Sequence, residues 1–159
     1  MEDADLLWRW ANDPETRRNS FNKSPIPYSE HLAWLEGRIR SAAVRLWIFS
    51  DQDGPVGQVR AEAAGNVVEV HILVAPERRG SGHGKTILTQ ALRLVREAYG
   101  DRAWVRASVL DHNVQSLKLF EACGFHEVGA VQLAGGERAV ILELTDAVPR
   151  GAGEATESR

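Results

Sequence analysis

The sequence contains a single cysteine, no long hydrophobic run and no strong excess of either charge. Because Cys123 is the only cysteine among 159 residues, an intrachain disulfide and a multi-cysteine zinc site are both excluded. A chain without disulfides is typical of a reducing compartment, so we expect a cytoplasmic protein. Cys123 directly precedes Gly124 at a predicted helix end, a position that favours packing over nucleophilic chemistry.

Long apolar segments are also absent. No apolar run approaches the ~18 residues that a membrane-spanning helix requires, and the first residues are acidic and polar rather than basic. The formal net charge of -3 lacks the basic excess that is usual in proteins that bind nucleic acids or anionic membranes. We therefore expect no membrane span, no signal peptide, and neither nucleic acid nor a membrane as a main partner.

The apolar pattern predicts one mixed α/β domain over residues 1–145. Alternating and continuous apolar runs indicate six strands, at 44–50, 55–63, 67–74, 103–109, 125–133 and 138–144. Helical spacing indicates four helices, at 5–12, 29–41, 87–99 and 113–123, and the second has Leu32, Leu35 and Ile39 as its apolar stripe. Polar residues 15–27 predict a long loop, and residues 146–159, which lack apolar periodicity, predict a disordered tail.

The stretch VAPERRGSGHGK, from Val74 to Lys85, predicts an anion-binding loop. It follows a predicted strand, precedes a predicted helix, and has glycine at positions 80, 82 and 84. Glycine permits positive φ angles and leaves backbone N–H groups uncovered, and a helix N-terminus adds unpaired donors and partial positive charge. The loop therefore suits a phosphate or pyrophosphate, and an ordinary glycine-rich turn without a ligand is the alternative.

The spacing excludes two other phosphate-binding motifs. A P-loop that ends at Gly84-Lys85-Thr86 needs a glycine where Arg79 stands. A dinucleotide fingerprint needs the spacing G-x-G-x-x-G, whereas the glycines here are spaced G-x-G-x-G.

The pattern that fits is R-x-x-G-x-G, from Arg79 to Gly84, and here the chain resembles the GNAT superfamily of acyl-CoA-dependent N-acetyltransferases. A second segment, from Asn113 to Phe125, resembles the family pattern N-x-x-[A/S]-x-x-x-[Y/F]-x-x-x-G-F at the appropriate distance. The resemblance covers about residues 4–144 and implies a central mixed, mostly antiparallel sheet flanked by helices. Family members begin with a strand, whereas a helix starts here almost at Met1, so we expect the first strand to be missing, either because it has been lost or because the chain is a truncated version.

The resemblance implies acetyl-CoA as cosubstrate and no metal. It implies that the backbone at the end of the strand pairs with the pantetheine arm and that loop amides hold the pyrophosphate. A plain helix cap is the alternative role for Asn113. The residues expected to contact the donor are Ile72, Leu73, Val74, Arg79, Gly80, Ser81, Gly82, His83, Gly84, Lys85, Asn113 and Phe120.

The catalytic residues implied by the resemblance are Glu69, His71 and Ser116. Glu69 occupies the position at which many family members carry a general base, and His71, on the same face of the strand, is placed to share or relay the proton. The tyrosine acid of the family is replaced here by Phe120, which has no proton to donate. Ser116 is the substitute donor, directly or through water, and a helix-cap role is its alternative.

The acceptor is predicted from the segment between Trp8 and Leu35. It resembles the subgroup that acetylates UDP-linked 4-amino-dideoxy sugars in nonulosonic acid biosynthesis, although Ala11 interrupts its W-R-N-D-P element. The resemblance implies a small-molecule amine, a UDP-amino sugar, as partner, and a solvated loop is the alternative reading of the segment. The candidate substrate residues are Arg17, Asn19, Ser20, Phe21 and His31.

Two other functions stay open at this point. One is a ribosomal-protein-type or small-amine N-acetyltransferase, which shares the donor site and differs in the acceptor. The other is a non-catalytic acyl-CoA-binding module, suggested by Phe120 and by the missing strand. A homodimer is compatible with each function.

Overall fold

The computed structural model describes residues 3–145, and the predicted tail at 146–159 lies outside them. Three helices precede the first strand: α1 (Ala4–Ala11), α2 (Pro14–Arg18) and α3 (Tyr28–Arg40). Then follow β1 (Val44–Asp51), β2 (Gly54–Ala64), β3 (Val67–Val74), the 3-10 turn η1 (Pro76–Arg78) and α4 (His83–Tyr99). The remaining elements are β4 (Trp104–Leu110), α5 (Val114–Ala122), β5 (Phe125–Gln132) and β6 (Arg138–Leu144).

The six strands form one sheet in the order β1-β2-β3-β4-β6-β5. Every neighbouring pair is antiparallel except β3 and β4, which run parallel and are connected through α4. This confirms the predicted mixed, mostly antiparallel sheet flanked by helices. As expected, no strand precedes α1 within residues 3–145.

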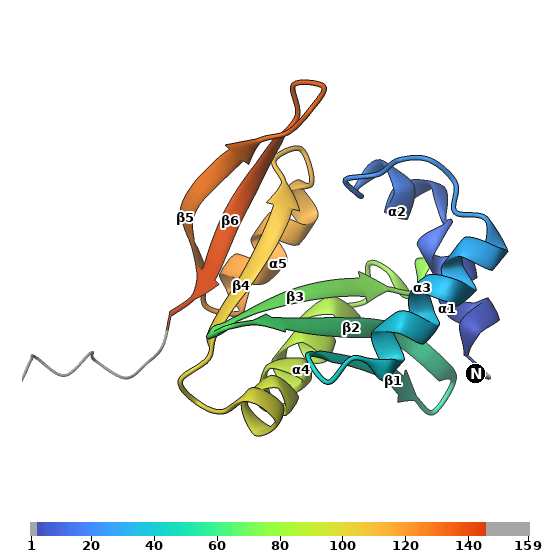
Figure 1. The fold of residues 1–159 in the computed structure, drawn as a ribbon, viewed down its shortest axis with the longest axis horizontal. Coiled ribbons are helices and arrows are strands. Elements are labelled where there is room, and N and C mark those ends of the chain that lie inside the picture. Colours follow the sequence, from blue (N-terminus) through green and yellow to red (C-terminus); the bar gives the residue numbers. More distant parts are fainter. Residues whose placement is uncertain (1–2, 146–159) are drawn as a thin grey trace, which may run out of the picture.

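The parallel pair β3 and β4 divides the sheet into two parts. The two strands pair only at their beginnings, where Val67, Val68 and Glu69 face Trp104, Val105 and Arg106. Beyond these pairs the strands diverge, and Figure 1 shows β4, β5 and β6 turning away from β1, β2 and β3. The backbone at the end of β3 is therefore unpaired on the side that faces β4.

Alternating side chains of β3 pack on opposite faces of the sheet. Val68 and Val70 are buried in a cluster with residues of α4, β4 and α5, whereas Leu73 packs against a cluster formed by α1 and α3. The predicted alternation is thus confirmed for these positions. Glu69 and His71 are in phase with Leu73, so they belong to the face that α1 and α3 partly cover.

Three local predictions were wrong or incomplete. The predicted loop at 15–27 begins with the helix α2, because Asp13 caps its N-terminus through Thr16 N and Pro14 occupies its first turn. Ile39, predicted as an apolar contact of α3, is 61% exposed. The helix α4 begins at His83, inside the glycine motif, rather than after it.

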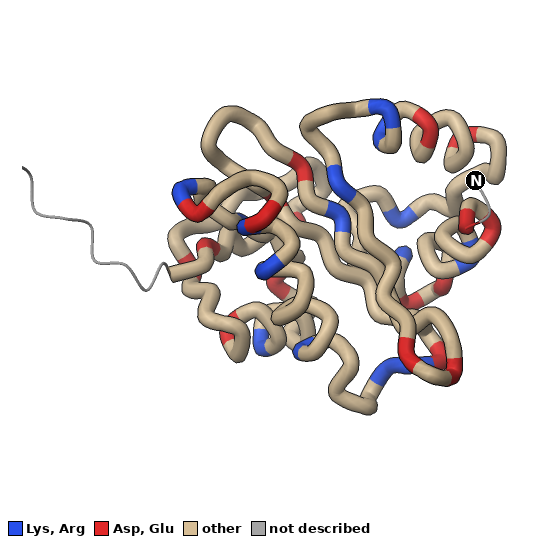
Figure 2. Tube along the Cα trace, turned by 90° about the horizontal axis from the view of Figure 1, so that it is seen from below, with Lys and Arg blue, Asp and Glu red and all other residues tan. Residues whose placement is uncertain are grey.

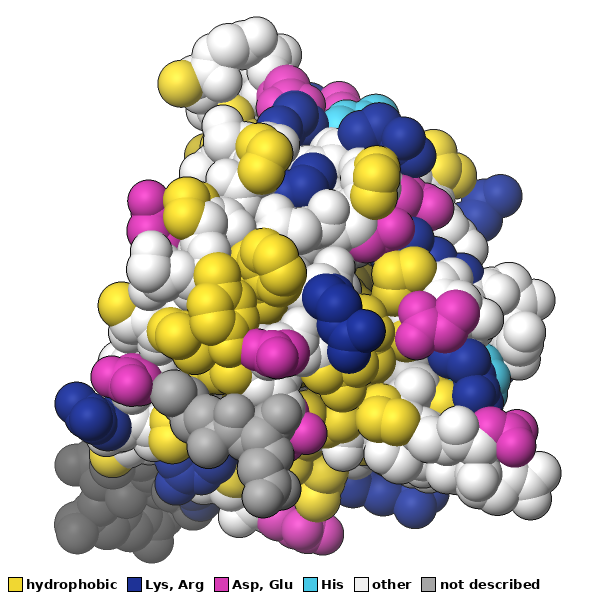
Figure 3. All heavy atoms as spheres, turned by 90° about the vertical axis from the view of Figure 1, so that its right-hand side faces the viewer, with side chains coloured by type: hydrophobic (Ala, Val, Ile, Leu, Met, Phe, Trp, Pro, Cys, Tyr) yellow, Lys and Arg dark blue, Asp and Glu magenta, His cyan; other side chains and the backbone are white. Residues whose placement is uncertain are grey.

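The surface carries charges of both signs. In Figure 2, lysine and arginine residues are interspersed with acidic residues over the molecule. Figure 3 shows the side of the molecule where α1, α2 and α3 lie, on which hydrophobic side chains lie between charged ones. Among the large hydrophobic residues of this N-terminal segment, Phe21, Tyr28 and Ile39 are exposed.

Candidate functional site

A cavity of about 910 Å³ lies at the divergence of β3 and β4. Its walls come from α1, α2 and the segment after it, α3, β2, β3, the glycine loop with the start of α4, β4 and α5. Every site residue predicted from the sequence lines this cavity except Glu69 and Ser81. The fold therefore brings the candidate donor and acceptor residues into one space, whose size is within the usual range for a small-molecule site.

The glycine loop has the geometry of an anion cradle. Gly80 and Gly82 adopt φ angles of 77° and 79°, and a Cβ at either position would meet open space. Glycine is therefore needed there for the backbone conformation rather than for lack of room. Gly82 is the N-cap of α4 and offers no side-chain cap, so the first N–H groups of α4 lack a side-chain acceptor. These residues fit a pyrophosphate group.

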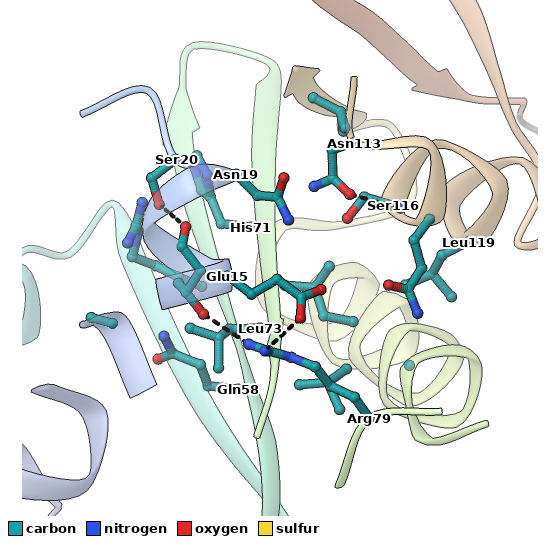
Figure 4. Close-up of a pocket in the computed structure, with 18 of the residues that line it drawn as sticks. Glu15, Asn19, Ser20, Gln58, His71, Leu73, Arg79, Asn113, Ser116 and Leu119 are labelled. Carbon is teal, nitrogen blue, oxygen red and sulfur yellow. Dashed lines mark hydrogen bonds and ion pairs between the residues drawn. The ribbon is translucent and has the colours of Figure 1, made fainter. Parts of the chain in front are cut away.

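The opposite wall of the cavity is the start of α5. The side-chain oxygen of Asn113 accepts a hydrogen bond from Ser116 N at 3.2 Å, so the predicted helix cap is confirmed. Both side chains line the cavity (Figure 4). Phe120, one turn further along α5, is 2% exposed and contacts Phe125 edge to face at 5.0 Å. Ser116 is thus the hydroxyl of this wall.

The segment after α2 is held in shape by Arg17. Its Nε donates to the carbonyl of Ala11 at 2.5 Å, and one Nη donates to the carbonyl of Asn22 at 3.0 Å. The other Nη donates to the Ser20 hydroxyl at 3.0 Å. Burial lowers the pKa of Arg17. The guanidinium therefore has a structural role, whereas Asn19 and Ser20 present shorter polar side chains to the cavity (Figure 4).

Two residues of β2 that were not predicted also line the cavity: Gln58 and Arg60. They face Leu73 and His71 across the β2–β3 pair. The Arg60 guanidinium lies 5.0 Å from the Trp34 ring centroid, and its Nε donates to Glu62 at 2.6 Å. Burial lowers the pKa of Arg60, and Glu62 opposes this shift. The alternation in GQVRAE was a usable signal, because it places polar residues on one face of the strand.

Several polar atoms of the cavity wall lack a protein partner. Within residues 3–145, His31 Nε2 and Gln58 Oε1 are buried without a hydrogen bond. His31 is only 3% exposed; burial lowers its pKa, and a backbone hydrogen bond to Ala4 opposes the shift. No acceptor in the described part of the chain takes a hydrogen bond from the Nη groups of Arg60. Buried polar groups are normally paired, so His31 Nε2 and Gln58 Oε1 suit a polar ligand, and the Arg60 Nη groups offer further donors.

His71 and Glu69 lie near each other on one face of β3 but in different surroundings. The His71 side chain lines the cavity, and burial, reinforced by Arg60, lowers its pKa to about 4. Its imidazole is therefore neutral at pH 7. Glu69 is opposite Glu62 on β2 and opposite Arg106 on β4, outside the cavity lining. Of the two predicted bases, only His71 borders the cavity directly.

The side chain of Arg79 departs from the predicted geometry of the loop. Its guanidinium is turned toward α2, where it contacts the side chains of Asp13, Glu15 and Thr16. Figure 4 shows Arg79 directed at Glu15. Lys85, in the first turn of α4, also lines the cavity.

Two further features concern the described residues alone. They contain no group of three or more histidine, cysteine, aspartate or glutamate residues placed to hold a metal ion. None of their helices is long and apolar enough to cross a membrane.

Comparison with known proteins relates this geometry to a family. Residues 1–126 match the model of the acetyltransferase (GNAT) domain. The Bacillus subtilis (strain 168) protein named "Putative phosphinothricin acetyltransferase YwnH" is 30% identical over 121 residues, which cover 72% of each chain.

Solved structures share the fold. The spermidine N-acetyltransferase of Vibrio cholerae, solved with CoA and spermine, superposes with a TM-score of 0.79 at 20% identity, over 90% of this chain and 89% of that one. The ribosomal-protein-alanine N-acetyltransferase of Brucella melitensis gives a TM-score of 0.72 at 21% identity, over 89% and 93% of the chains. With its glycine cradle, its divergent β3–β4 pair and its family match, the chain belongs to the GNAT family and is an N-acetyltransferase.

Proposed function

We propose that the protein transfers an acetyl group from acetyl-CoA to a primary amine of a nucleotide-linked amino sugar. The observation that carries the acceptor assignment is the set of unpaired polar atoms in the cavity: His31 Nε2, Gln58 Oε1 and the Nη groups of Arg60. A ligand that satisfies them must supply both donors and acceptors. The hydroxyl groups of a sugar do so, and anionic oxygens suit the guanidinium.

The donor half of the cavity is suited to the coenzyme. Backbone N–H groups between Gly80 and Lys85 are placed for the pyrophosphate, and Lys85 adds a formal positive charge. The free backbone edge between Ile72 and Val74 is available to pair with the amide groups of the pantetheine arm. Bound acetyl-CoA supplies the activated acyl group, as a thioester.

Acetyl transfer requires two proton transfers, which we assign to residues on two walls of the cavity. As the amine nitrogen attacks, the C–N bond forms, the C–S bond breaks, the nitrogen loses a proton and the thiolate gains one. His71, neutral at pH 7, borders the cavity and accepts the proton. Its Nε2 lies 3.9 Å from Glu62 Oε1, and Glu69, opposite Glu62, is a second carboxylate on the same strand face. Ser116 stands on the opposite wall, where it protonates the thiolate directly or through water.

The charge of the cavity lining supports an oxygen-rich acceptor over a polyamine. A polyamine needs several free carboxylates, yet the acidic residues of the lining are Glu15 and Glu30, and Glu15 is paired with Arg79. Of the five cationic side chains that line the same cavity, Arg17, Arg78 and Arg79 are occupied by protein partners, so Arg60 and Lys85 carry the argument. A small amine is the second candidate, favoured by the 30% identity to a protein named for phosphinothricin.

A mass-spectrometric screen with acetyl-CoA tests the acceptor. The panel contains a UDP-linked 4-amino sugar, phosphinothricin, spermidine and a peptide with a free N-terminus. We expect acetylation of the amino sugar, with a strong loss of turnover in Glu69→Gln and His71→Gln. Turnover of phosphinothricin or the peptide without turnover of the amino sugar would transfer the assignment to the small-amine or ribosomal-protein type.

A second measurement links the acceptor to the unpaired atoms. Gln58→Leu removes a buried acceptor and is expected to raise the acceptor KM about tenfold, because one hydrogen bond is lost in the complex. Gln52→Leu is the matched control, since Gln52 is exposed in the β1–β2 turn. An unchanged acceptor KM in Gln58→Leu would show that this oxygen does not contact the acceptor.

A further inference from the structure

Arg79 is the first residue of the glycine motif, yet its side chain binds a different element. One Nη lies 2.8 Å from Asp13 Oδ2 and 3.2 Å from Glu15 Oε2, and the other Nη lies 2.9 Å from Thr16 Oγ1. All three partners belong to α2 or to its N-cap. The guanidinium side chain is 23% exposed, so these contacts are partly shielded from solvent.

The α2 residues that contact Arg79 are also hydrogen-bonded to one another. Asp13 Oδ2 accepts hydrogen bonds from Thr16 N at 3.0 Å and from Thr16 Oγ1 at 3.2 Å. Although burial opposes it, these bonds and Arg79 hold the pKa of Asp13 below its usual value. The same carboxylate therefore caps α2 and binds the donor loop, so the start of α2 and the loop form one polar unit.

The position of α2 depends on hydrogen bonds and ion pairs rather than on buried apolar side chains. No residue of α2 is buried, so the helix has no apolar anchor of its own. At its far end, the Arg18 carbonyl lies 3.3 Å from His112 Nε2, in the turn before α5. Lys23 donates to the same carbonyl at 2.8 Å and pairs with Glu137 at 2.8 Å. The segment from 13 to 26 thus connects the glycine loop with the turn that carries Asn113.

We call the part of the cavity lining supplied by α2 and the segment after it the acceptor wall. It contacts both elements that are expected to bind the donor, the glycine loop and the turn before α5. Asn19, Ser20 and Phe21 lie between the Arg18 carbonyl and Lys23, which both contact the other side of the cavity mouth, and all three line the cavity. Figure 4 shows α2 beside β3, with Glu15 directed at Arg79. A shift of α2 would move these three side chains relative to His71.

We propose that Arg79 is a positioning residue that holds α2 over the cavity and does not bind the pyrophosphate. The backbone N–H groups of the loop and Lys85 bind the pyrophosphate, and Arg79 fixes the acceptor wall to the loop that they form. The donor loop and the acceptor wall then move as one unit. The proposal is independent of which amine is accepted.

The test compares two measurements on Arg79→Ala. Isothermal titration with coenzyme A is expected to give a Kd within about threefold of the wild-type value, because the amide cradle is intact. Hydrogen exchange of residues 13–26 is expected to accelerate about tenfold or more, because α2 loses its charge-assisted contacts. Neither measurement requires an acceptor, so failure of the sugar assignment leaves this test unaffected.

Matched variants separate positioning from loss of charge. Glu15→Gln combined with Thr16→Val leaves the donor loop and the Asp13 contact unchanged and removes the other two contacts of Arg79, so it is expected to reproduce part of the faster exchange of residues 13–26. Arg78→Ala removes the same charge from the neighbouring position, but Arg78 pairs with Asp51 in the β1–β2 turn, so exchange in α2 is expected to stay at the wild-type rate. Arg79→Lys, which keeps the charge, is expected to recover part of the protection.

With the best acceptor of the screen, Arg79→Ala is expected to raise the acceptor KM about tenfold while kcat at saturation stays within about twofold. We expect KM to rise without a matching fall in kcat because α2 positions the acceptor and does not contact the reacting atoms. The proposal is overturned if coenzyme A binding weakens tenfold while exchange in α2 is unchanged, since Arg79 would then be a phosphate ligand. Unchanged exchange with unchanged binding overturns it equally.

Discussion

His71 is a residue whose chemistry depends on its surroundings more than on its type. Its side chain is 37% exposed, but it lines the cavity and lies opposite the partly buried Arg60. Burial first and Arg60 second lower its pKa from 6.5 to about 4. A neutral imidazole keeps its proton-accepting nitrogen available across the physiological pH range.

The lowered pKa predicts an acid-sensitive fold. Between pH 6.5 and about 4 the unfolded chain protonates at His71 while the folded chain does not, so the free energy of unfolding decreases as the pH falls through this window. Urea denaturation at pH 7.5 and at pH 5 is expected to show this decrease, and His71→Gln is expected to reduce it. His31, whose pKa is also lowered, retains part of the effect.

The matched control for this measurement is His126→Gln, because His126 is exposed on β5. The difference in the free energy of unfolding of His126→Gln between pH 7.5 and pH 5 is expected to equal that of the wild-type protein. If His71→Gln keeps the full wild-type difference between the two pH values, His71 does not carry the lowered pKa.

At the residue level, the sequence predicted which side chains line the cavity but not which atoms each of them contacts. The cavity contains the predicted His71, Asn113 and Ser116, because two motifs specified their places in the chain. Arg79 was assigned to the phosphate from its motif alone, and its contacts with α2 depend on residues more than 60 positions away. A single sequence gives no information on such long-range pairs.

At the level of elements, close backbone approach explains one glycine of β2. A Cβ on Gly57 would lie 2.5 Å from the Leu73 carbonyl oxygen and 2.9 Å from Ile87 Cδ1. Because the first contact is backbone of the neighbouring strand, β2 and β3 would have to separate. Gly57→Ala is expected to lower the free energy of unfolding by about 1–3 kcal/mol. Chemical denaturation measures this change.

Gly37→Ala is the contrasting substitution. Gly37 lies inside α3, and a Cβ there would meet nothing within 4 Å. Alanine is expected to stabilise the fold by about 0.5–1 kcal/mol, because glycine in a helix interior loses more backbone entropy on folding. If the two substitutions changed stability equally, the close contact at Gly57 would not be the cause of its effect.

The helix α2 shows why element prediction failed in one segment. Its five residues, PETRR, contain no apolar position, so the periodicity that identified the other helices is absent. The signals that were present are local: Asp13 as N-cap and Pro14 in the first turn. Capping chemistry alone therefore predicts this helix, whereas apolar spacing predicts a loop.

At the level of the whole molecule, the fold class followed from motifs and element order, but the cavity did not. Six strands were predicted near their observed positions, since each has a clear apolar pattern. Beyond three residue pairs β4 no longer pairs with β3, while its other edge pairs with β6, a strand that is distant in the chain. Such non-local pairing leaves no periodic signal in one sequence.

The divergent sheet raises the question of whether its two parts unfold separately. They share few strand pairs, because β3 and β4 pair over only three residues each. One hydrophobic cluster nevertheless joins them: it contains Val68 and Val70 of β3, Val105 of β4, Leu88 of α4 and Phe120 of α5. Separation of the two parts would expose this cluster to water, at a cost of roughly 25 cal/mol for each Å² of apolar area.

We therefore expect a single cooperative unfolding transition. Four of the five tryptophans, Trp8, Trp10, Trp34 and Trp47, belong to α1, α3 and β1, so their fluorescence reports mainly the first part of the sheet and its helices. Far-UV circular dichroism reports both parts. In urea the two signals are expected to share one midpoint, because the joint cluster prevents either part from unfolding alone. Two separate midpoints would mean that the cluster under the divergence does not couple the parts, and that the cavity lies between independently stable units.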